Sequence, residues 1–553
     1  MKTPTPVPQR AAVEYFAFVV IAVASFLTRL FPLSISPYPF NNDSITECEI
    51  ASEILDSGHL NLPSISEQGI HSMGIPAFNV LIAYFSAVIG SPPLECAQFI
   101  VAVAAVATIG GLYLLARIIT GSFLGGLAAG FMGVMLGTFV YTTGSVWKEA
   151  LGITFMVLVL LTFVGRSQPR NRVLMFTILM MLPLTHHLVS AVTLLAMALA
   201  IAWSWYIAIA ATGLGRRHWF DLLTVGVPAV WMVVYYEVIN FDSSTLISSR
   251  RTLALAPILF LMLCALVVAI LSKKSHWRFT FAPAIGLGLS TLLVLDYYGH
   301  LFPYEPSAPA LFNFLLSGTI VFLFSLAWYG TEMIIETLPV HRAIQLCLLI
   351  SPLAIMGVAI LDGLSSSSHK VFYRTFDFLD LAIMIGAGAA LVSLYAHRRK
   401  AFITIGSAIV VASIVSFPYG YESSSLLGVR HDTQPFEMEA LVWVSSHNET
   451  PNFVSDERIS YVAHALYGGY KNSYLPNYIM TNRTLSPQNF YVVEESWTTL
   501  GVNDFPRGTV VIPSWNYTRT TSAADTVLIS GPVGDRIQIF TASGLGAYHV
   551  YGV

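Results

Sequence analysis

Apolar runs of about twenty residues recur along most of this chain. A helix needs roughly 20 consecutive apolar residues to cross a bilayer core, and only 11% of the 553 residues are charged, against about 25% in a soluble domain. The pattern therefore predicts a mainly α-helical, polytopic transmembrane bundle of about thirteen spans. We place the spans at 13–33, 97–117, 122–142, 149–165, 173–189, 190–212, 219–239, 252–272, 279–299, 309–331, 343–361, 376–396 and 402–418.

Whether the shorter apolar segment 74–90 spans the membrane decides on which side every later loop lies. If this segment lies along the membrane surface, most basic residues face the side of the N-terminus, as the positive-inside rule requires of cytoplasmic loops. If it spans, the basic clusters fall outside. We therefore predict a surface helix and a cytoplasmic N-terminus. The cytoplasmic set is then Lys2, Arg10, Arg117, Arg166, Arg170, Arg172, Arg216, Arg217, Lys273, Lys274, Arg278, Arg342, Arg398, Arg399 and Lys400.

This topology divides the chain in two. Residues 1–418 form the membrane domain, whose first outer loop, 34–96, carries two amphipathic surface helices. Residues 419–553 are more polar, with a helical stretch "EALVWVSSHN" and strand-like runs such as "RIQIFTAS" and "YHVYGV". They predict a small α/β domain outside the membrane. The N-x-[ST] sequons all fall on the outer side in this topology, at Asn42, Asn448, Asn482 and Asn516.

Acidic residues concentrate just after the first span, in "PFNNDSITECEIASEILDSGHL" (39–60). If 44–57 is a helix, Glu49, Glu53 and Asp56 form a solvated face. Glu47 falls on the apolar side, where it is either a site residue or the partner of Ser44 in an S-x-x-E capping box. Asp43 lies at the membrane boundary, where a carboxylate is costly unless it has a function or a partner.

Further polar residues fall on the same outer plane. Lys148 and Glu149 enter the span at 149–165, where Lys148 is either a snorkelling interfacial lysine or a ligand-binding cation. His186 and His187 end the span at 173–189; neighbours on a helix face different ways, so we expect one to contact an anionic ligand and the other to pack.

A second group of cations leads into the span at 376–396, within "SSSSHKVFYRTFDFLDLAI". Lys370 and Arg374 are four residues apart and share a face if the segment is helical; His369 is adjacent. A Lys/Arg pair at headgroup level suits an anionic lipid phosphate, which Arg can grip in a fork. An internal Arg374–Asp377 ion pair is the alternative.

In this order and sidedness, the chain resembles the GT-C superfamily of membrane glycosyltransferases. The resemblance is carried by "NNDSITECEIASEILDSGHL", then "HSMGIPAFNVLIAYFSAVIG", "TTGSVWKEALG", "LTHH" and "HKVFYRTFDF", followed by an outer C-terminal domain. It implies a GT-C fold, a catalytic carboxylate at Asp43, and a polyprenyl-phosphate sugar donor used outside the cytoplasm. It also implies an archaeal plasma-membrane location, which the sequons support.

The residues fit such chemistry. A hydroxyl acceptor (on a glycan, lipid or protein) needs a base as it attacks the anomeric carbon, and we assign this role to Asp43, with Glu47 beside it. The departing lipid phosphate needs cations, which we assign to Arg374, Lys370, Lys148 and His369. We expect inversion in one step. We assign the remaining substrate contacts to Glu149, His186, His187 and His71.

Several family motifs are missing. The outer C-terminal region contains no WWDxG-type motif, which disfavours an oligosaccharyltransferase. "TTGSVWKE" stands where a metal-dependent member has DxD, so we predict no metal ligands and a divalent cofactor has no support. No HPPxGK-like motif follows the first acid; Glu67 and His71 occupy that region, which disfavours an O-mannosyltransferase.

Two alternatives remain beside this prediction. One is an oligosaccharyltransferase-like enzyme. The other is a lipid or solute transporter, which would place charge near the bilayer midplane rather than at its outer boundary. The chain has no basic stripe for nucleic acid, and its four cysteines have no metal-binding spacing. Cys48 and Cys96 are candidates for a disulfide.

Overall fold

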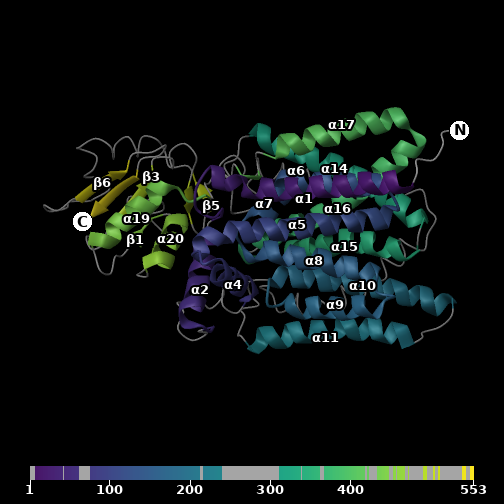
Figure 1. Ribbon diagram of the computed structural model, residues 1–553, viewed down its shortest axis with the longest axis horizontal. Helices are drawn as coiled ribbons and strands as arrows, with labels where there is room; N and C mark the ends of the chain where they lie inside the picture. Colours follow the sequence, from purple (N-terminus) through teal and green to yellow (C-terminus); the bar gives the residue numbers. More distant parts are fainter. Residues whose placement is uncertain are drawn as a thin grey trace.

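The computed structural model describes residues 7–41, 43–60, 75–211, 216–238, 310–337, 339–361, 366–417, 420–421, 432–447 and short stretches from 453 to 552. Long helices run side by side in a bundle, with the N-terminus at one end (Figure 1). The bundle helices are α1 (Val7–Leu30), α5 (Pro93–Thr120), α6 (Phe123–Met135), α7 (Gly137–Gly144), α8 (Lys148–Val164), α9 (Pro169–Met181), α10 (His187–Ala211), α11 (Arg216–Val238), α14 (Ala310–Thr337), α15 (Pro339–Leu361), α16 (Ser366–His397) and α17 (Arg399–Ser416).

These helices confirm a helical membrane protein but not thirteen spans. Six described helices are long and apolar enough to cross a bilayer, or seven if the bent pair α6–α7 is one span. Helix α8 has 17 residues and α9 has 13, which makes each short for a crossing. The predicted spans at 252–272 and 279–299 lie outside the described residues.

The α6–α7 pair bends by 68° at Leu136, whose backbone is extended (φ −70°, ψ 115°). The bend exposes carbonyls at the end of α6, and Arg29 from α1 binds them: it donates to Gly133 O at 2.8 Å and Val134 O at 3.0 Å. The same fully buried guanidinium donates to Thr143 Oγ1 at 2.7 Å. Arg29 therefore stabilises the break between α6 and α7. Its hydrogen-bond donors are satisfied by neutral acceptors.

Helices α14 and α16 pack backbone to backbone through glycine. A Cβ added at Gly330 would lie 1.8 Å from the carbonyl oxygen of Gly386, and one added at Gly386 would lie 2.5 Å from that of Ala327. Small residues at helix interfaces let transmembrane backbones approach this closely. This contact is what brings α16 into the bundle core.

We expect Gly330→Val to destabilise the protein by about 3 kcal/mol or more, because the clash is with backbone, which cannot move aside like a side chain. Thermal unfolding of purified protein in detergent measures this. Gly226→Ala on α11 is the matched control, since a Cβ there meets nothing within 4 Å. An unchanged melting temperature for Gly330→Val would refute the tight α14–α16 contact.

Two short helices lie at the end of the bundle opposite the N-terminus: α2 (Ser44–Ser57) and α4 (Ala77–Ile89), preceded by the 3-10 turn η1 (Phe31–Ser34) (Figure 1). Buried Cys48 and Ala51 of α2 pack with Phe78 and Ile82 of α4 in one apolar cluster. Helix α4 has only 13 residues, so it is too short to span. Cys48 and Cys96, in the same cluster, are free thiols.

The C-terminal region contributes helices and strands beside α2. A five-stranded sheet has the order β2-β1-β3-β7-β6, with β1 parallel to β2 and β3, and β7 antiparallel to β3 and β6. Ile45 of α2 is buried against apolar residues of the two C-terminal helices, and Ser36 Oγ donates to the carbonyl of Thr433. The elements are α19 (Pro435–His447), α20 (Glu457–Tyr467), β1 (Phe453–Val454), β2 (Lys471–Asn472), β3 (Phe490–Glu494), β4 (Val502–Asp504), β5 (Gly508–Val510), β6 (Gln538–Ala542) and β7 (Tyr548–Gly552).

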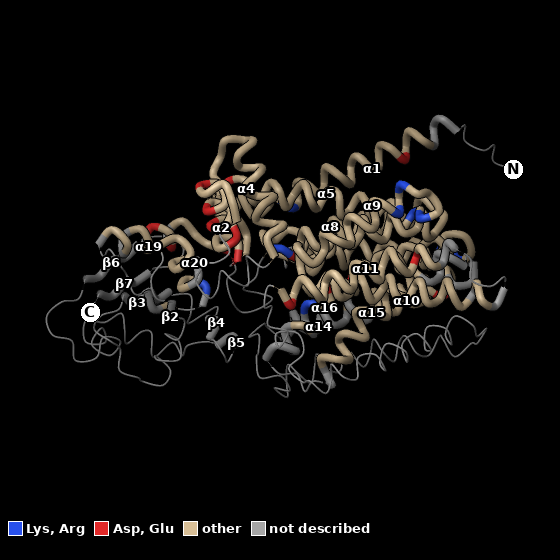
Figure 2. Tube along the Cα trace, turned by 90° about the horizontal axis from the view of Figure 1, so that it is seen from below, with Lys and Arg blue, Asp and Glu red and all other residues tan. Residues whose placement is uncertain are grey.

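Charge divides between the two ends of the bundle. Lys and Arg gather near α9 on the side of the N-terminus, whereas Asp and Glu follow α2 at the opposite end (Figure 2). Arg117 at the end of α5 pairs with Glu14 at the start of α1, which places both at the N-terminal end. The sequons at Asn42, Asn448, Asn482 and Asn516 lie outside the described residues.

Candidate functional site

The turn that leads into α2 presents Asp43 to solvent. Asp43 is the N-cap residue of α2 and its side chain makes no cap hydrogen bond. The turn itself is anchored: Phe40 N donates to Gln98 Oε1 at 3.0 Å, and Ser44 Oγ donates to Pro39 O at 2.9 Å. Gln98 in turn donates to Arg29 O and to the last residue of α7. A rigid frame therefore holds an exposed carboxylate.

Glu47 is buried, one helical turn beyond Asp43. Its carboxylate accepts from Asn79 Nδ2 of α4 and lies 3.6 Å from Lys148 Nζ at the start of α8. Burial raises the pKa of Glu47, while Lys148 and Asn79 oppose that shift. The S-x-x-E capping box is not formed, because the cap position belongs to Asp43 and the Glu47 side chain turns towards the cation.

Glu149 and the two histidines meet behind this pair. Glu149 is 1% exposed, and its Oε2 lies 4.0 Å from His186 Nε2. The imidazole rings of His186 and His187 stack at 4.7 Å with an 18° tilt. Our expectation that the two rings face different ways was wrong. His186 precedes α10, in the turn after α9, so helical spacing does not separate the rings.

Arg374 reaches the same place from α16. Its guanidinium lies 5.7 Å from the centre of the Trp147 ring, a distance at which a cation is attracted to an aromatic face. Trp147 packs edge-to-face on Tyr141, with ring centres 5.5 Å apart. The Tyr141 hydroxyl accepts from Asn41 Nδ2 at 3.4 Å, in the turn that leads to Asp43. The turn before α2, the start of α8 and the start of α16 are therefore joined through Tyr141 and Trp147.

Several predicted residues remain without a described side chain. His71 lies outside the described residues; His369 and Lys370 lie on α16, four residues or so before Arg374, but only their backbone is described. The remaining predicted residues, Asp43, Glu47, Lys148, Glu149, His186, His187 and Arg374, are gathered at one end of the bundle.

Sequence reasoning missed the residues that hold the site together. Asn79 donates to both the main-chain and side-chain oxygens of Glu47. Asn41 carries the positive φ of 103° in the turn before Asp43. The signal for Asn79 was present: an amide in an otherwise apolar 13-residue helix needs a polar partner when it is buried.

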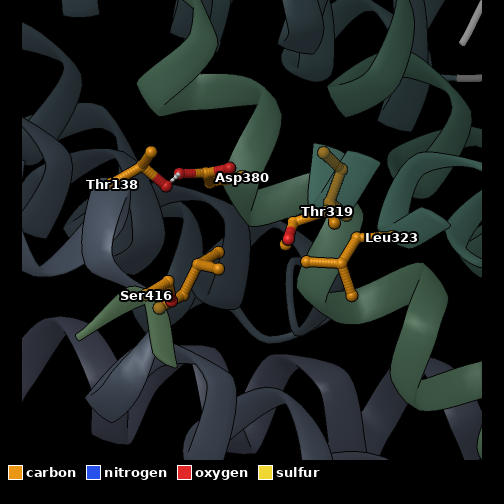
Figure 3. A pocket seen from close by; sticks show the side chains of 7 residues that line it. Thr138, Thr319, Leu323, Asp380 and Ser416 are labelled. Carbon is orange, nitrogen blue, oxygen red and sulfur yellow. Dashed lines mark hydrogen bonds between the residues drawn. The ribbon is translucent and has the colours of Figure 1, made fainter. Parts of the chain in front are cut away.

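A small cavity of about 20 Å³ adjoins the bend between α6 and α7 (Figure 3). Asp380 is its carboxylate, and the hydroxyls of Thr138, Thr319 and Ser416 line it together with apolar side chains. Thr138 Oγ1 donates to Asp380 Oδ2 at 2.6 Å. The lining contains no cation, so this is a different environment from the charged group around Tyr141.

Within the described residues, no group of three or more His, Cys, Asp or Glu side chains is arranged to hold a metal ion. Glu149 and His186 provide two candidate ligands, but their atoms are 4.0 Å apart and Lys148 and Arg374 bring positive charge to the same place. These described residues do not fit a metal centre.

Replacing Asn79 should test the Glu47 anchor. We expect Asn79→Leu, which keeps the branched shape and the number of side-chain heavy atoms, to cost about 1–3 kcal/mol in unfolding free energy because the Glu47 carboxylate loses a donor. The pKa of Glu47 should rise further, since the Asn79 bond lowers it. Val80→Ala, at an exposed position of the same helix, is the control. Equal thermal stability of the two variants would contradict the anchor.

No protein-family model matches this sequence, and no curated protein matches it. Among solved structures, the Archaeoglobus fulgidus oligosaccharyltransferase AglB, in complex with an inhibitory peptide and a dolichol-phosphate, matches with TM-score 0.55 and 12% identity. The match covers 98% of this chain and 74% of AglB. The same enzyme with Zn and sulfate gives TM-score 0.51, 13% identity, and 96% and 72% coverage.

The mycobacterial arabinofuranosyltransferase AftD matches with TM-score 0.49 and 14% identity, over 97% of this chain and 41% of AftD. At 12–13% identity, the likeness to the oligosaccharyltransferase is one of fold. The chain has a GT-C fold, as its resemblance in sequence order implied.

Proposed function

We propose that this protein is a membrane glycosyltransferase that moves a sugar from a polyprenyl-phosphate donor to an extracytoplasmic hydroxyl acceptor. The observation that carries the proposal is the chain of contacts that links the Asp43 turn to Arg374 through Tyr141 and Trp147, at one end of a GT-C bundle. An exposed carboxylate and a cation held on an aromatic ring are the two groups that such a transfer needs.

Asp43 acts as the general base. As the acceptor oxygen attacks the anomeric carbon, its proton passes to the Asp43 carboxylate. The bond from the anomeric carbon to the phosphate oxygen breaks on the opposite face, which inverts the configuration. The exposure of Asp43 and the absence of a cap hydrogen bond leave its oxygens available for this step.

Arg374 stabilises the departing lipid phosphate, because its fork of donors matches two phosphate oxygens. Lys370 and His369, on the preceding turn of α16, are assigned to the same phosphate. Lys148 pairs with Glu47. We therefore assign it two roles: it neutralises the Glu47 carboxylate beside the base, and it binds the phosphate. Glu149, His186, His187 and His71 are assigned to substrate contacts.

The finer topology is part of the same proposal. We assign residues 1–418 to a membrane domain of about thirteen spans, and 419–553 to a small α/β domain on the extracytoplasmic side. The N-terminus is then cytoplasmic and the membrane is the plasma membrane. Separation of the basic end from the α2 end supports this sidedness (Figure 2).

A transfer assay tests the function. Purified protein in detergent is incubated with a panel of polyprenyl-phosphate monosaccharides, hexoses and pentoses, and a mixture of glycan, lipid and peptide hydroxyl acceptors. Mass spectrometry should detect a product one sugar heavier together with free polyprenyl phosphate. If the folded protein transfers sugar to none of the acceptors, the proposal is rejected.

The fold likeness to AglB favours a second candidate, an oligosaccharyltransferase-like enzyme. It would transfer a whole glycan to the side-chain amide of an Asn in a peptide. The missing WWDxG-type motif argues against it. Adding a lipid-linked oligosaccharide and an Asn-x-Thr peptide to the same panel separates the two, because only this second enzyme attaches an oligosaccharide to the asparagine amide.

A further inference from the structure

Asn41 has a backbone conformation that needs an explanation. Its φ is +103°, and no other non-glycine residue in the described part of the chain has a positive φ. Asparagine tolerates this region better than most residues, but glycine would adopt it without strain. The chain has an asparagine here although its side chain is only 3% exposed. The side chain must therefore contribute something that glycine lacks.

Both ends of the Asn41 amide are used. Its Oδ1 accepts from the backbone N–H of Asp43 at 3.0 Å, and its Nδ2 donates to the Tyr141 hydroxyl at 3.4 Å. Its main-chain carbonyl accepts from Ser44 N at 3.2 Å. One buried side chain thus joins the turn that carries Asp43 to helix α7.

Tyr141 is the other half of this bridge. Its ring packs on Phe40 at 5.9 Å and on Trp147 at 5.5 Å, and Trp147 carries the Arg374 guanidinium. A continuous path of contacts therefore runs from the Asp43 amide, through Asn41 and Tyr141, to Trp147 and Arg374. The separation between base and cation depends on this path.

We propose that Asn41 is a positioning residue that fixes Asp43 relative to Tyr141 and, through Trp147, to Arg374. This inference rests on the proposed function for the role of Asp43, but not for the contacts themselves. Asn41 touches no reacting atom; it orients the residue that does.

Glycine separates the positioning role from a backbone role. We expect Asn41→Gly to fold, because glycine suits the φ, with a small loss of stability for the two side-chain hydrogen bonds that it removes. Its kcat should fall at least tenfold, while the KM for the donor changes less than twofold. In hydrogen exchange, the amides of residues 43 and 44 should exchange faster in the folded full-length protein. Wild-type kcat and wild-type exchange would overturn the proposal.

Asn41→Asp keeps the acceptor for the Asp43 amide and adds a negative charge beside the base. A like charge disfavours ionisation of a carboxylate, so the acid limb of the pH–rate profile should move to higher pH. An unmoved limb would show that the titrating base does not lie beside residue 41, which overturns the proposal.

Tyr141→Phe removes the hydroxyl that Asn41 Nδ2 contacts. If the two residues act as one unit, the Asn41→Gly/Tyr141→Phe double variant loses no more activity than the worse single variant. Additive losses would overturn the coupling. Asp43→Asn serves as the reference: retained turnover there rejects the proposed function, whereas an inactive Asp43→Asn beside a fully active Asn41→Gly rejects only this inference.

Discussion

Asp43→Asn should fold like the wild-type protein and lose sugar transfer by about 10²–10⁴-fold, the usual contribution of a general base. Asparagine has nearly the same shape but cannot take the acceptor proton. The substitution should cost little stability, because Asp43 is exposed and asparagine is as good an N-cap residue as aspartate. The measurement is the initial rate of transfer with the donor that the panel identifies, beside a thermal unfolding curve.

Glu53→Gln is the matched control for this variant. Glu53 lies on the same helix, exposed to solvent on the face away from the apolar cluster. Glu53→Gln should keep full activity. This result would show that the loss of transfer in Asp43→Asn does not come from removing a negative charge from α2 in general. If Asp43→Asn retains more than about a tenth of the wild-type rate, another group is the base, and Glu47 would be the next carboxylate to test.

The helical bundle and helix α2 could be predicted from the periodicity of apolar residues alone. The predicted helix 44–57 matches α2 residue for residue, because its apolar face is regular and Gly58 ends it in a left-handed conformation (φ 70°). The order of polar residues along the chain also indicated which of them share one end. Such features depend on neighbours in sequence, and the sequence contains them directly.

The contacts between those residues could not be predicted from the sequence. The Glu47–Asn79 contact joins residues 32 apart, and the Arg29–Thr143 contact joins residues 114 apart. Two roles were open for Glu47, a capping box or a site residue, and the capping box is not formed because Glu47 pairs with a buried lysine from a distant helix. Local sequence patterns indicate which contacts a residue can make with its neighbours in sequence. Burial among partners from other helices decides which contacts it makes.

Arg374→Ala should lower kcat/KM for the lipid-linked donor by about a hundredfold, the scale of losing one donor to developing negative charge. Arg374 is half-buried and packs on Trp147, so the variant keeps its fold but loses the cation that faces the phosphate. The effect should appear as weaker binding of polyprenyl phosphate as well as slower turnover. Equilibrium binding of a fluorescent polyprenyl phosphate measures the first directly.

Arg374→Lys makes the test more specific. Lysine keeps the charge but has no fork and stacks less well on an aromatic ring, so it should recover only part of the loss. Arg398→Ala, which replaces an exposed arginine between α16 and α17, is the control and should bind donor normally. Unchanged donor affinity in Arg374→Ala would remove this residue from the phosphate. It would also make Lys370, on the preceding turn of the same helix, the cation to examine.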